Sequence, residues 1–163
     1  MKIFFISFYL FFLPFKIAMS MDVVTKGKLT ISSAWSRSTV DLKRPGSAYL
    51  SIKNFGLKKD SLIAVQTPIA KKAELHNHNI ENGIMKMRRV PVIDLPPNST
   101  ITLKPGGFHI MLFKPNKKLE VGQTFPLTLT FKRTGNIEIM VNVVANSTKK
   151  LEPHKKNNKT HSH

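Results

Sequence analysis

The sequence predicts an all-β fold, either a β-sandwich or a small Greek-key barrel, and three features support this. The chain from residue 28 onward is a series of short apolar or alternating runs, and Gly, Pro, Asn and Asp separate them. No stretch keeps the spacing of an amphipathic helix together with helix caps. The 163 residues are 41% hydrophobic, which is enough for one domain with a real core.

The predicted strands follow the apolar runs in order along the chain. They are residues 28–34, 48–53, 61–66, 71–76, 84–90, 100–103, 108–113, 125–132 and 137–144. The last two form the clearest hairpin, because apolar and polar residues alternate on both sides of a Gly-Asn turn. Turns are expected at the breaker segments between the runs, including "NHNIENG" and "KPGG".

The two ends of the chain differ from its middle. Residues 1–20 combine Lys2, a short apolar run and the small-x-small pattern Ala18-Met19-Ser20, which predicts a cleaved signal peptide and a periplasmic protein. The run is too short for a membrane span, although an uncleaved anchor is the alternative. Residues 21–146 then form the domain. Residues 147–163 lose all apolar periodicity and predict a disordered basic tail that contains His154, His161 and His163.

Charge and cysteine content restrict the partners. The formal net charge is +17, which often signals nucleic acid, but export argues against that partner. Acidic protein or membrane surfaces are better candidates, and a generally basic proteome explains the charge equally well. The chain has no cysteine, which excludes thiolate-ligated metal sites and a lipobox cysteine.

Catalytic patterns are missing from the sequence. There is no cysteine, no G-x-S-x-G elbow, no phosphate-binding glycine loop and no obvious pair of carboxylates for acid–base catalysis. We therefore expect a protein that is not an enzyme.

Histidine and methionine residues form pairs two positions apart. The pairs are His76 and His78 in "ELHNHN", Met85 and Met87 in "GIMKMRRV", and His109 and Met111 in "GGFHIMLFK". In an extended strand both members of a pair project from one face. In the third segment, alternation places Phe108, Ile110 and Leu112 on the opposite, core-facing side.

This set of side chains suits copper in its reduced state. Thioether sulfur is a soft neutral ligand that binds Cu(I) well and hard cations poorly, and imidazole accepts both oxidation states of copper. The alternative is that the methionines fill gaps in the core and that the histidines are structural. Spacing within the pairs does not decide between these interpretations.

The longer spacing resembles a known signature. From His76, ten residues lead to Met87, and twenty-one more lead to His109-Ile110-Met111. This is the H-x10-M-x21-H-x-M pattern of the periplasmic copper chaperone PCu(A)C family. The segments "AWSRST", "GSAYLSIKNFG", "AELH", "GIMKMR", "LKPGGFHIMLF" and "FPLTLTFKRTG" are also similar to that family.

The resemblance implies a cupredoxin-like Greek-key β-sandwich that binds one Cu(I) through His76, Met87, His109 and Met111. It further implies copper delivery towards the CuA centre of cytochrome c oxidase, with subunit II or a Sco-type copper chaperone as partner. His78 and Met85 are possible secondary donors. The tail residues His154, His161 and His163 are possible Cu(II) ligands.

Two other functions remain open from the sequence. One is a copper-sequestering or resistance protein in which the tail captures Cu(II). The other is an exported Ig-like interaction module that binds no metal.

Overall fold

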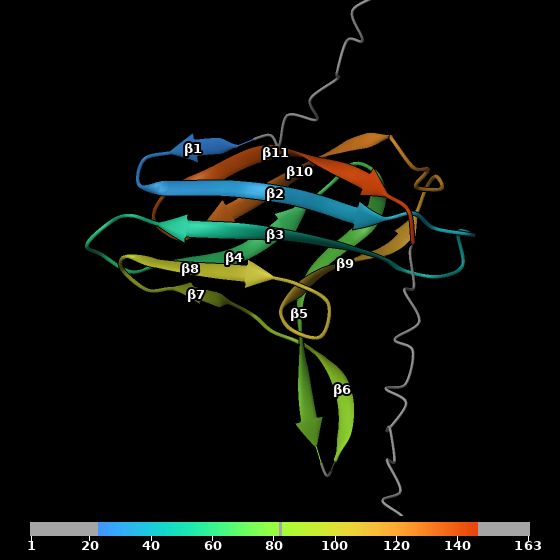
Figure 1. Ribbon diagram of the computed structural model, residues 1–163, viewed down its shortest axis with the longest axis horizontal. Helices are drawn as coiled ribbons and strands as arrows, with labels where there is room; N and C mark the ends of the chain where they lie inside the picture. Colours follow the sequence, from blue (N-terminus) through green and yellow to red (C-terminus); the bar gives the residue numbers. More distant parts are fainter. Residues whose placement is uncertain (1–22, 82, 147–163) are drawn as a thin grey trace, which may run out of the picture.

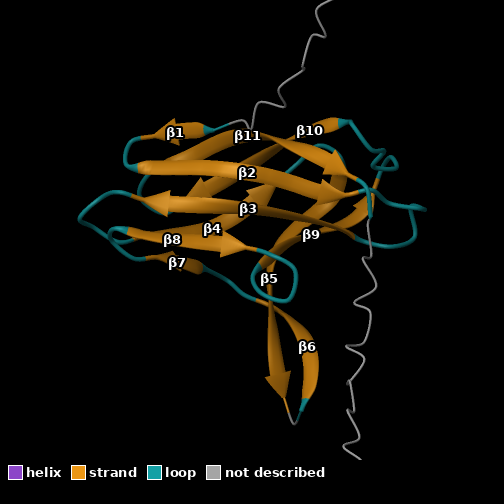
Figure 2. Cartoon of the chain, viewed as in Figure 1, coloured by secondary structure: helices purple, strands orange, loops and turns teal. Residues whose placement is uncertain are grey.

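The computed structural model describes residues 23–81 and 83–146, and every regular element in these ranges is a β-strand (Figure 2). In chain order the strands are β1 (Val24–Lys26), β2 (Leu29–Arg37), β3 (Gly46–Asn54), β4 (Asp60–Gln66), β5 (Ala70–Glu81), β6 (Ile84–Arg89), β7 (Ile93–Leu95), β8 (Ser99–Leu103), β9 (His109–Pro115), β10 (Thr124–Phe131) and β11 (Gly135–Val144). The all-β prediction is confirmed. The predicted signal peptide and basic tail lie outside the described residues.

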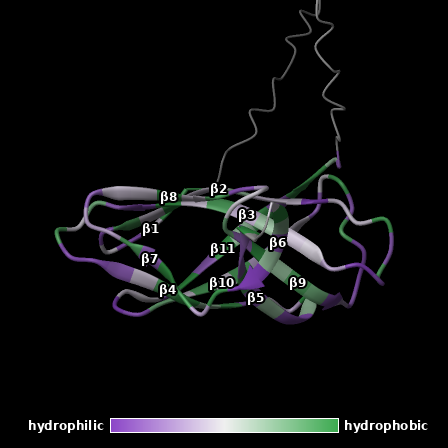
Figure 3. Cartoon of the chain, turned by 90° about the horizontal axis from the view of Figure 1, so that it is seen from below, coloured by the Kyte–Doolittle hydropathy of each residue, from purple (hydrophilic) through white to green (hydrophobic). Residues whose placement is uncertain are grey.

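The strands form one continuous sheet with the order β6-β5-β9-β3-β2-β11-β10-β4-β7, to which β1 and β8 add at β2 and β3. Seen edge-on, the sheet folds over into two layers, with β2 and β8 in one and β4 and β10 in the other (Figure 3). The two halves are joined by a parallel pairing of β11 with β2. The result is a sandwich, as predicted.

The core lies between the layers because alternate residues of most strands point inward. In β10 and β11 the inward residues are those of the predicted hairpin, and their register is Leu127 opposite Ile139 and Leu129 opposite Ile137. In β9 the core-facing residues are Ile110 and Leu112, both completely buried. The prediction that Ile110 and Leu112 pack into the sandwich is therefore confirmed.

A β-bulge in β2 changes which of its residues face the core. Leu29 and Ile31 are buried before the bulge, whereas Ser36 is buried after it, and Ser33 takes a positive φ of 54° at the change of register. An extra residue at a bulge reverses the alternation of the strand. The bulge consequently sends Trp35 to the outer face of the sheet.

Two short strands, β1 and β7, were not predicted. Each has three residues, too few to show alternation, and each is defined by its pairing with β2 or β4. Strand β7 is anchored by Ile93 and Leu95, which are buried.

The turn predicted over "NHNIENG" is present but limited to the end of that segment, where Gly83 takes a φ of 76° between β5 and β6. Strand β5 continues to Glu81, and β6 pairs with its second half from His76↔Arg89 to Glu81↔Ile84. Asn has a low strand propensity, but cross-strand pairing overrides it here. The resulting β5–β6 hairpin projects from the body of the sandwich (Figure 1).

Candidate metal centre

The six histidine and methionine residues of the three pairs lie on one face of the three-stranded segment β6-β5-β9. Strand β5 places His76 directly opposite His109 of β9, and it places His78 directly opposite Met87 of β6. Met111 lies opposite Glu74, two residues along β5 from His76. Residues two apart on a strand share a face, and diagonal neighbours on adjacent strands are within reach of long side chains.

Met85 is the outermost donor on this face, because it lies opposite Ile80 near the tip of the hairpin. Strand pairing thus places all four residues of the long-spacing signature and the two possible secondary donors on one face of the sheet. The opposite face of β9 and of the first half of β5 packs into the core through Ile110 and Leu75.

Exposure of the donors increases from the sandwich towards the hairpin. His109 is 2% exposed, Met111, His76 and His78 are partly buried, and Met87 and Met85 are 53% and 61% exposed. The structure therefore buries His109 and leaves the thioethers of β6 accessible to solvent.

The turn before β9 fixes the orientation of His109. Gly106 has a φ of 81°, and the Gly107 amide donates to the Lys104 carbonyl at 3.1 Å, closing the turn predicted from "KPGG". His109 Nδ1 lies 2.8 Å from the Gly107 carbonyl oxygen, so Nδ1 carries the proton and donates it. The lone pair therefore resides on Nε2, which is buried and has no hydrogen-bond partner.

Glu74 fixes the orientation of His76 in a similar way. His76 Nε2 donates to Glu74 Oε2 at 3.0 Å, and His76 Nδ1 is left buried without a partner. A carboxylate that holds one imidazole nitrogen fixes the tautomer and raises the basicity of the other nitrogen, as at many metal sites. Glu74 is in turn held by Lys72 Nζ at 2.7 Å and Arg89 Nε at 3.3 Å.

The surroundings of Glu74 and His109 shift their pKa values so that Glu74 is ionised and His109 is neutral. Hydrogen bonds from Lys72 and His76 lower the pKa of Glu74, so this carboxylate is ionised at neutral pH. Burial lowers the pKa of His109, and the nearby His78 and His76 add to this, against the hydrogen bond to Gly107. The His109 ring is therefore neutral at neutral pH.

The imidazole nitrogens without hydrogen-bond partners provide a test of whether the residues fit a metal ion. His76 Nδ1, His78 Nδ1 and His109 Nε2 are buried and unpartnered. Buried polar atoms of this kind are normally satisfied, and an absent ion is one recognised explanation of an exception. Neutral nitrogen lone pairs beside thioethers fit a soft cation.

The aromatic environment of the site comes from the same face. The ring centroid of His109 lies 5.9 Å from that of His76 and 4.8 Å from that of His78. Phe113 covers the inner end, with its ring centroid 5.8 Å from His76. Among residues 23–81 and 83–146, no three His, Asp or Glu side chains are arranged to hold a metal ion by themselves.

Two contributors to the site were missed at the level of sequence. Glu74 was not predicted as part of the site, although its position two residues before His76 places it on the same face. Phe113 was not predicted as part of the site either. The methionine of the C-terminal hairpin, Met140, lies on β11 opposite Pro126 and is not part of this face.

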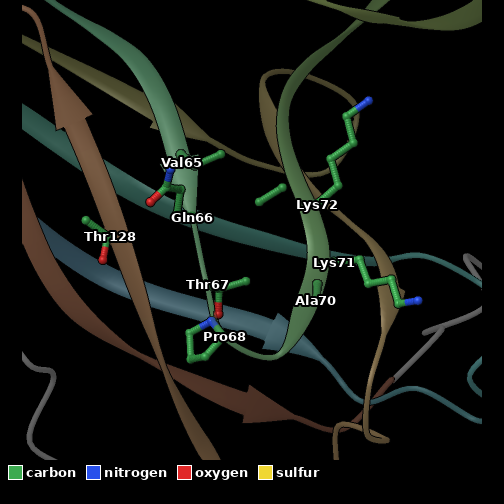
Figure 4. A pocket seen from close by; sticks show the side chains of 9 residues that line it. Val65, Gln66, Thr67, Pro68, Ala70, Lys71, Lys72 and Thr128 are labelled. Atoms are coloured by element: carbon green, nitrogen blue, oxygen red, sulfur yellow. The ribbon is translucent and has the colours of Figure 1, made fainter.

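A surface hollow elsewhere does not coincide with the donors. It lies where β4 leads into β5 and is lined by Thr67, Pro68, Lys71 and Thr128, among others (Figure 4). None of the six donors lines it. In the part of the chain that the structure describes, no helix is long and apolar enough to cross a membrane.

Comparisons with known proteins agree with this architecture. The family model described as "Putative lipoprotein LpqE-like" matches residues 29–143. "Putative lipoprotein Lxx21020" from Leifsonia xyli subsp. xyli is 32% identical over 106 residues, which is 62% of this chain and 60% of that protein. The chain thus spans less than two thirds of the length of this relative.

Two solved structures are similar over nearly their whole length. The apo PCuAC domain from PmoF1 has a TM-score of 0.66 at 31% identity, covering 76% of this chain and 99% of that domain. The copper-bound PCuAC domain from PmoF2 has a TM-score of 0.66 at 28% identity, covering 77% and 99%. From the matched family model and these domain-length similarities, we conclude that the chain belongs to the LpqE-like family and that its β-sandwich is a PCu(A)C domain.

Proposed function

We propose that this protein is an exported copper metallochaperone that holds Cu(I) between His76, Met87, His109 and Met111. One observation carries the proposal: the unpartnered buried nitrogens of His76 and His109 lie on a sheet face that also bears the thioethers of Met87 and Met111. The copper-bound state of the similar PmoF2 domain supports copper as the ion. His76 would bind through Nδ1 and His109 through Nε2, since their other nitrogens are engaged.

The donor set favours a carrier of Cu(I). All four ligands are neutral, and sulfur with nitrogen donors suits a soft singly charged ion better than Zn²⁺ or Mg²⁺. The absence of thiolates from the chain leaves a site that an acceptor with cysteine ligands can outcompete. This relation fits delivery towards the CuA centre of cytochrome c oxidase, directly to subunit II or through a Sco-type chaperone.

Exposure favours transfer over storage. Met87 is more than half exposed and Met85 beside it is more exposed still, so an acceptor can reach the ion from the hairpin side. Acceptor thiolates would displace the thioethers one at a time through a shared-ligand intermediate. The short N-terminal apolar run supports export, which would place this exchange in the periplasm.

The direct test is Cu(I) titration of the Met111→Leu variant against a chromogenic Cu(I) chelator. Leucine nearly conserves the volume of methionine, so the fold should persist while the thioether is lost. We expect one equivalent of Cu(I) in the unmodified protein and a clearly weaker site in the variant. Met140→Leu is the matched control, because Met140 lies on β11 outside the donor face.

Two results would contradict the proposal. An unmodified protein that takes up no Cu(I) would exclude a copper function altogether. Unchanged affinity in folded Met111→Leu would show that the ligand assignment is wrong. To test delivery, copper-loaded protein is mixed with reduced apo subunit II fragment or apo Sco-type protein, and copper should appear on the acceptor.

A further inference from the structure

A third histidine, His78, occupies the middle of the donor face although it is outside the long-spacing signature. It lies directly opposite Met87 in the β5–β6 register, whereas His76 lies opposite Arg89. The His78 ring is also nearer to His109 than the His76 ring is, with centroids at 4.8 Å against 5.9 Å. His78 therefore lies between the buried imidazole of β9 and the exposed thioether of β6.

His78 also presents a nitrogen suited to coordination. Its Nδ1 is buried and has no hydrogen-bond partner, as is true of His76 Nδ1 and His109 Nε2. A single unsatisfied nitrogen could result from local packing. Three of them on one face, next to Met87 and Met111, indicate that a ligand normally occupies the space between them.

We propose that His78 is a fifth copper donor, which exchanges with His76 and so moves Cu(I) towards the exposed side of the site, where Met87 and Met85 lie on the hairpin. The proposal rests on the copper-carrier function proposed above. In the inner position the ion would be held by the four proposed ligands, His76, Met87, His109 and Met111. In the outer position His78 Nδ1 would replace His76 while Met87, His109 and Met111 stay bound, with Met85 one row further out.

The exchange needs no redox step and no additional reactant. One Cu–N bond to His76 breaks as one Cu–N bond to His78 forms, and the ion stays Cu(I). Each imidazole coordinates the ion as a neutral ligand, so the charge of the ligand set does not change in the exchange. His76 is tied to Glu74, whereas Met87 is exposed, and the step therefore moves the ion from a fixed ligand towards one that an acceptor can displace.

The first measurement observes the imidazole nitrogens directly. The full-length ¹⁵N-labelled protein is titrated without oxygen with up to one equivalent of Cu(I), and long-range ¹H–¹⁵N spectra follow each ring nitrogen. We expect the Nδ1 resonance of His78 to shift together with His76 Nδ1 and His109 Nε2. A shift of His76 and His109 without His78 would overturn the proposal and leave the copper-carrier function standing.

The second measurement separates donation from transfer. We expect folded His78→Asn to bind one Cu(I) but to release it to a thiol-containing chelator more slowly than the unmodified protein, because the outer position is lost. Asn79→Ala is the matched control, since residue 79 lies on the other face of β5. Unchanged or faster release from His78→Asn would reject the exchange role.

Failure of the His78 proposal can be told apart from failure of the proposed copper function. If no imidazole nitrogen shifts and no Cu(I) is taken up, both proposals are wrong. If His78→Asn does not fold, the spectra of the unmodified protein decide whether His78 is a donor.

Discussion

At the proposed copper site, Glu74 is expected to control copper affinity through its hydrogen bond to His76. Its side chain accepts hydrogen bonds from His76 Nε2 at 3.0 Å and from Lys72 Nζ at 2.7 Å. The Glu74→Gln substitution keeps the shape of the side chain but removes its charge. His76 then loses the carboxylate that fixes its tautomer and orients Nδ1.

The expected loss of copper affinity in Glu74→Gln follows from the role of Glu74 behind His76. Loss of a carboxylate partner behind a metal-binding histidine typically lowers metal affinity by about 10- to 100-fold. At ~1.4 kcal/mol per tenfold change, this corresponds to about 1.4–2.8 kcal/mol. The ion pairs of Glu74 with Lys72 and Arg89 contribute less to folding, about 0.2–1 kcal/mol each, because those side chains are 63% and 69% exposed.

The assay is Cu(I) competition with a chromogenic chelator, together with urea unfolding followed by the fluorescence of Trp35. The expected result is weaker copper binding in Glu74→Gln with only a small change in the free energy of unfolding. Asp94→Asn serves as control. Asp94 also pairs with a lysine, Lys59, but Asp94 lies on β7. Equal copper affinity in Glu74→Gln and the unmodified protein would refute the argument that Glu74 orients His76.

Further predictions concern the fold that supports the site. Asp60 accepts hydrogen bonds from Ser61, Arg133 and Thr134; burial by itself would raise its pKa, but these bonds together lower it. Asp60 thus contributes stability that is present above the unfolded pKa of 3.8 and lost as pH falls through the lower folded value. In urea unfolding, Asp60→Asn should cost about 1–3 kcal/mol at neutral pH, and the difference from the unmodified protein should vanish in strong acid. Leu129→Ala opens a cavity in the core and should lower the free energy of unfolding by about 2–5 kcal/mol, while Cu(I) stoichiometry persists if the site depends only on its own face. Gly106→Ala meets no atom within 4 Å but keeps a φ of 81°, so a modest destabilisation of about 1 kcal/mol and a weaker Cu(I) site are expected, and a Tm and affinity equal to those of the unmodified protein would show that the turn tolerates a side chain.

Much of the sandwich could be predicted because its strands carry their own signal. In β9, β10 and β11 buried residues alternate with outward residues, and this two-residue period is visible in the sequence. Strands β1 and β7 could not be predicted, because three residues cannot show a period and pairing with distant strands defines them. The second half of β5 was missed for a related reason: its Asn residues favour turns, and only pairing with β6 keeps it extended.

The candidate donors of this protein were determined by its sequence, since the His and Met side chains favour a soft ion and the resemblance of their long spacing to the PCu(A)C signature singles out His76, Met87, His109 and Met111. Tertiary structure decided how these donors are presented. The register of β5 with β9 and β6 set which donors are neighbours, burial set which of them an acceptor can reach, and Glu74 set which nitrogen of His76 is free. Cross-strand register and depth depend on residues far apart in the chain, and periodicity within one strand carries no information about them.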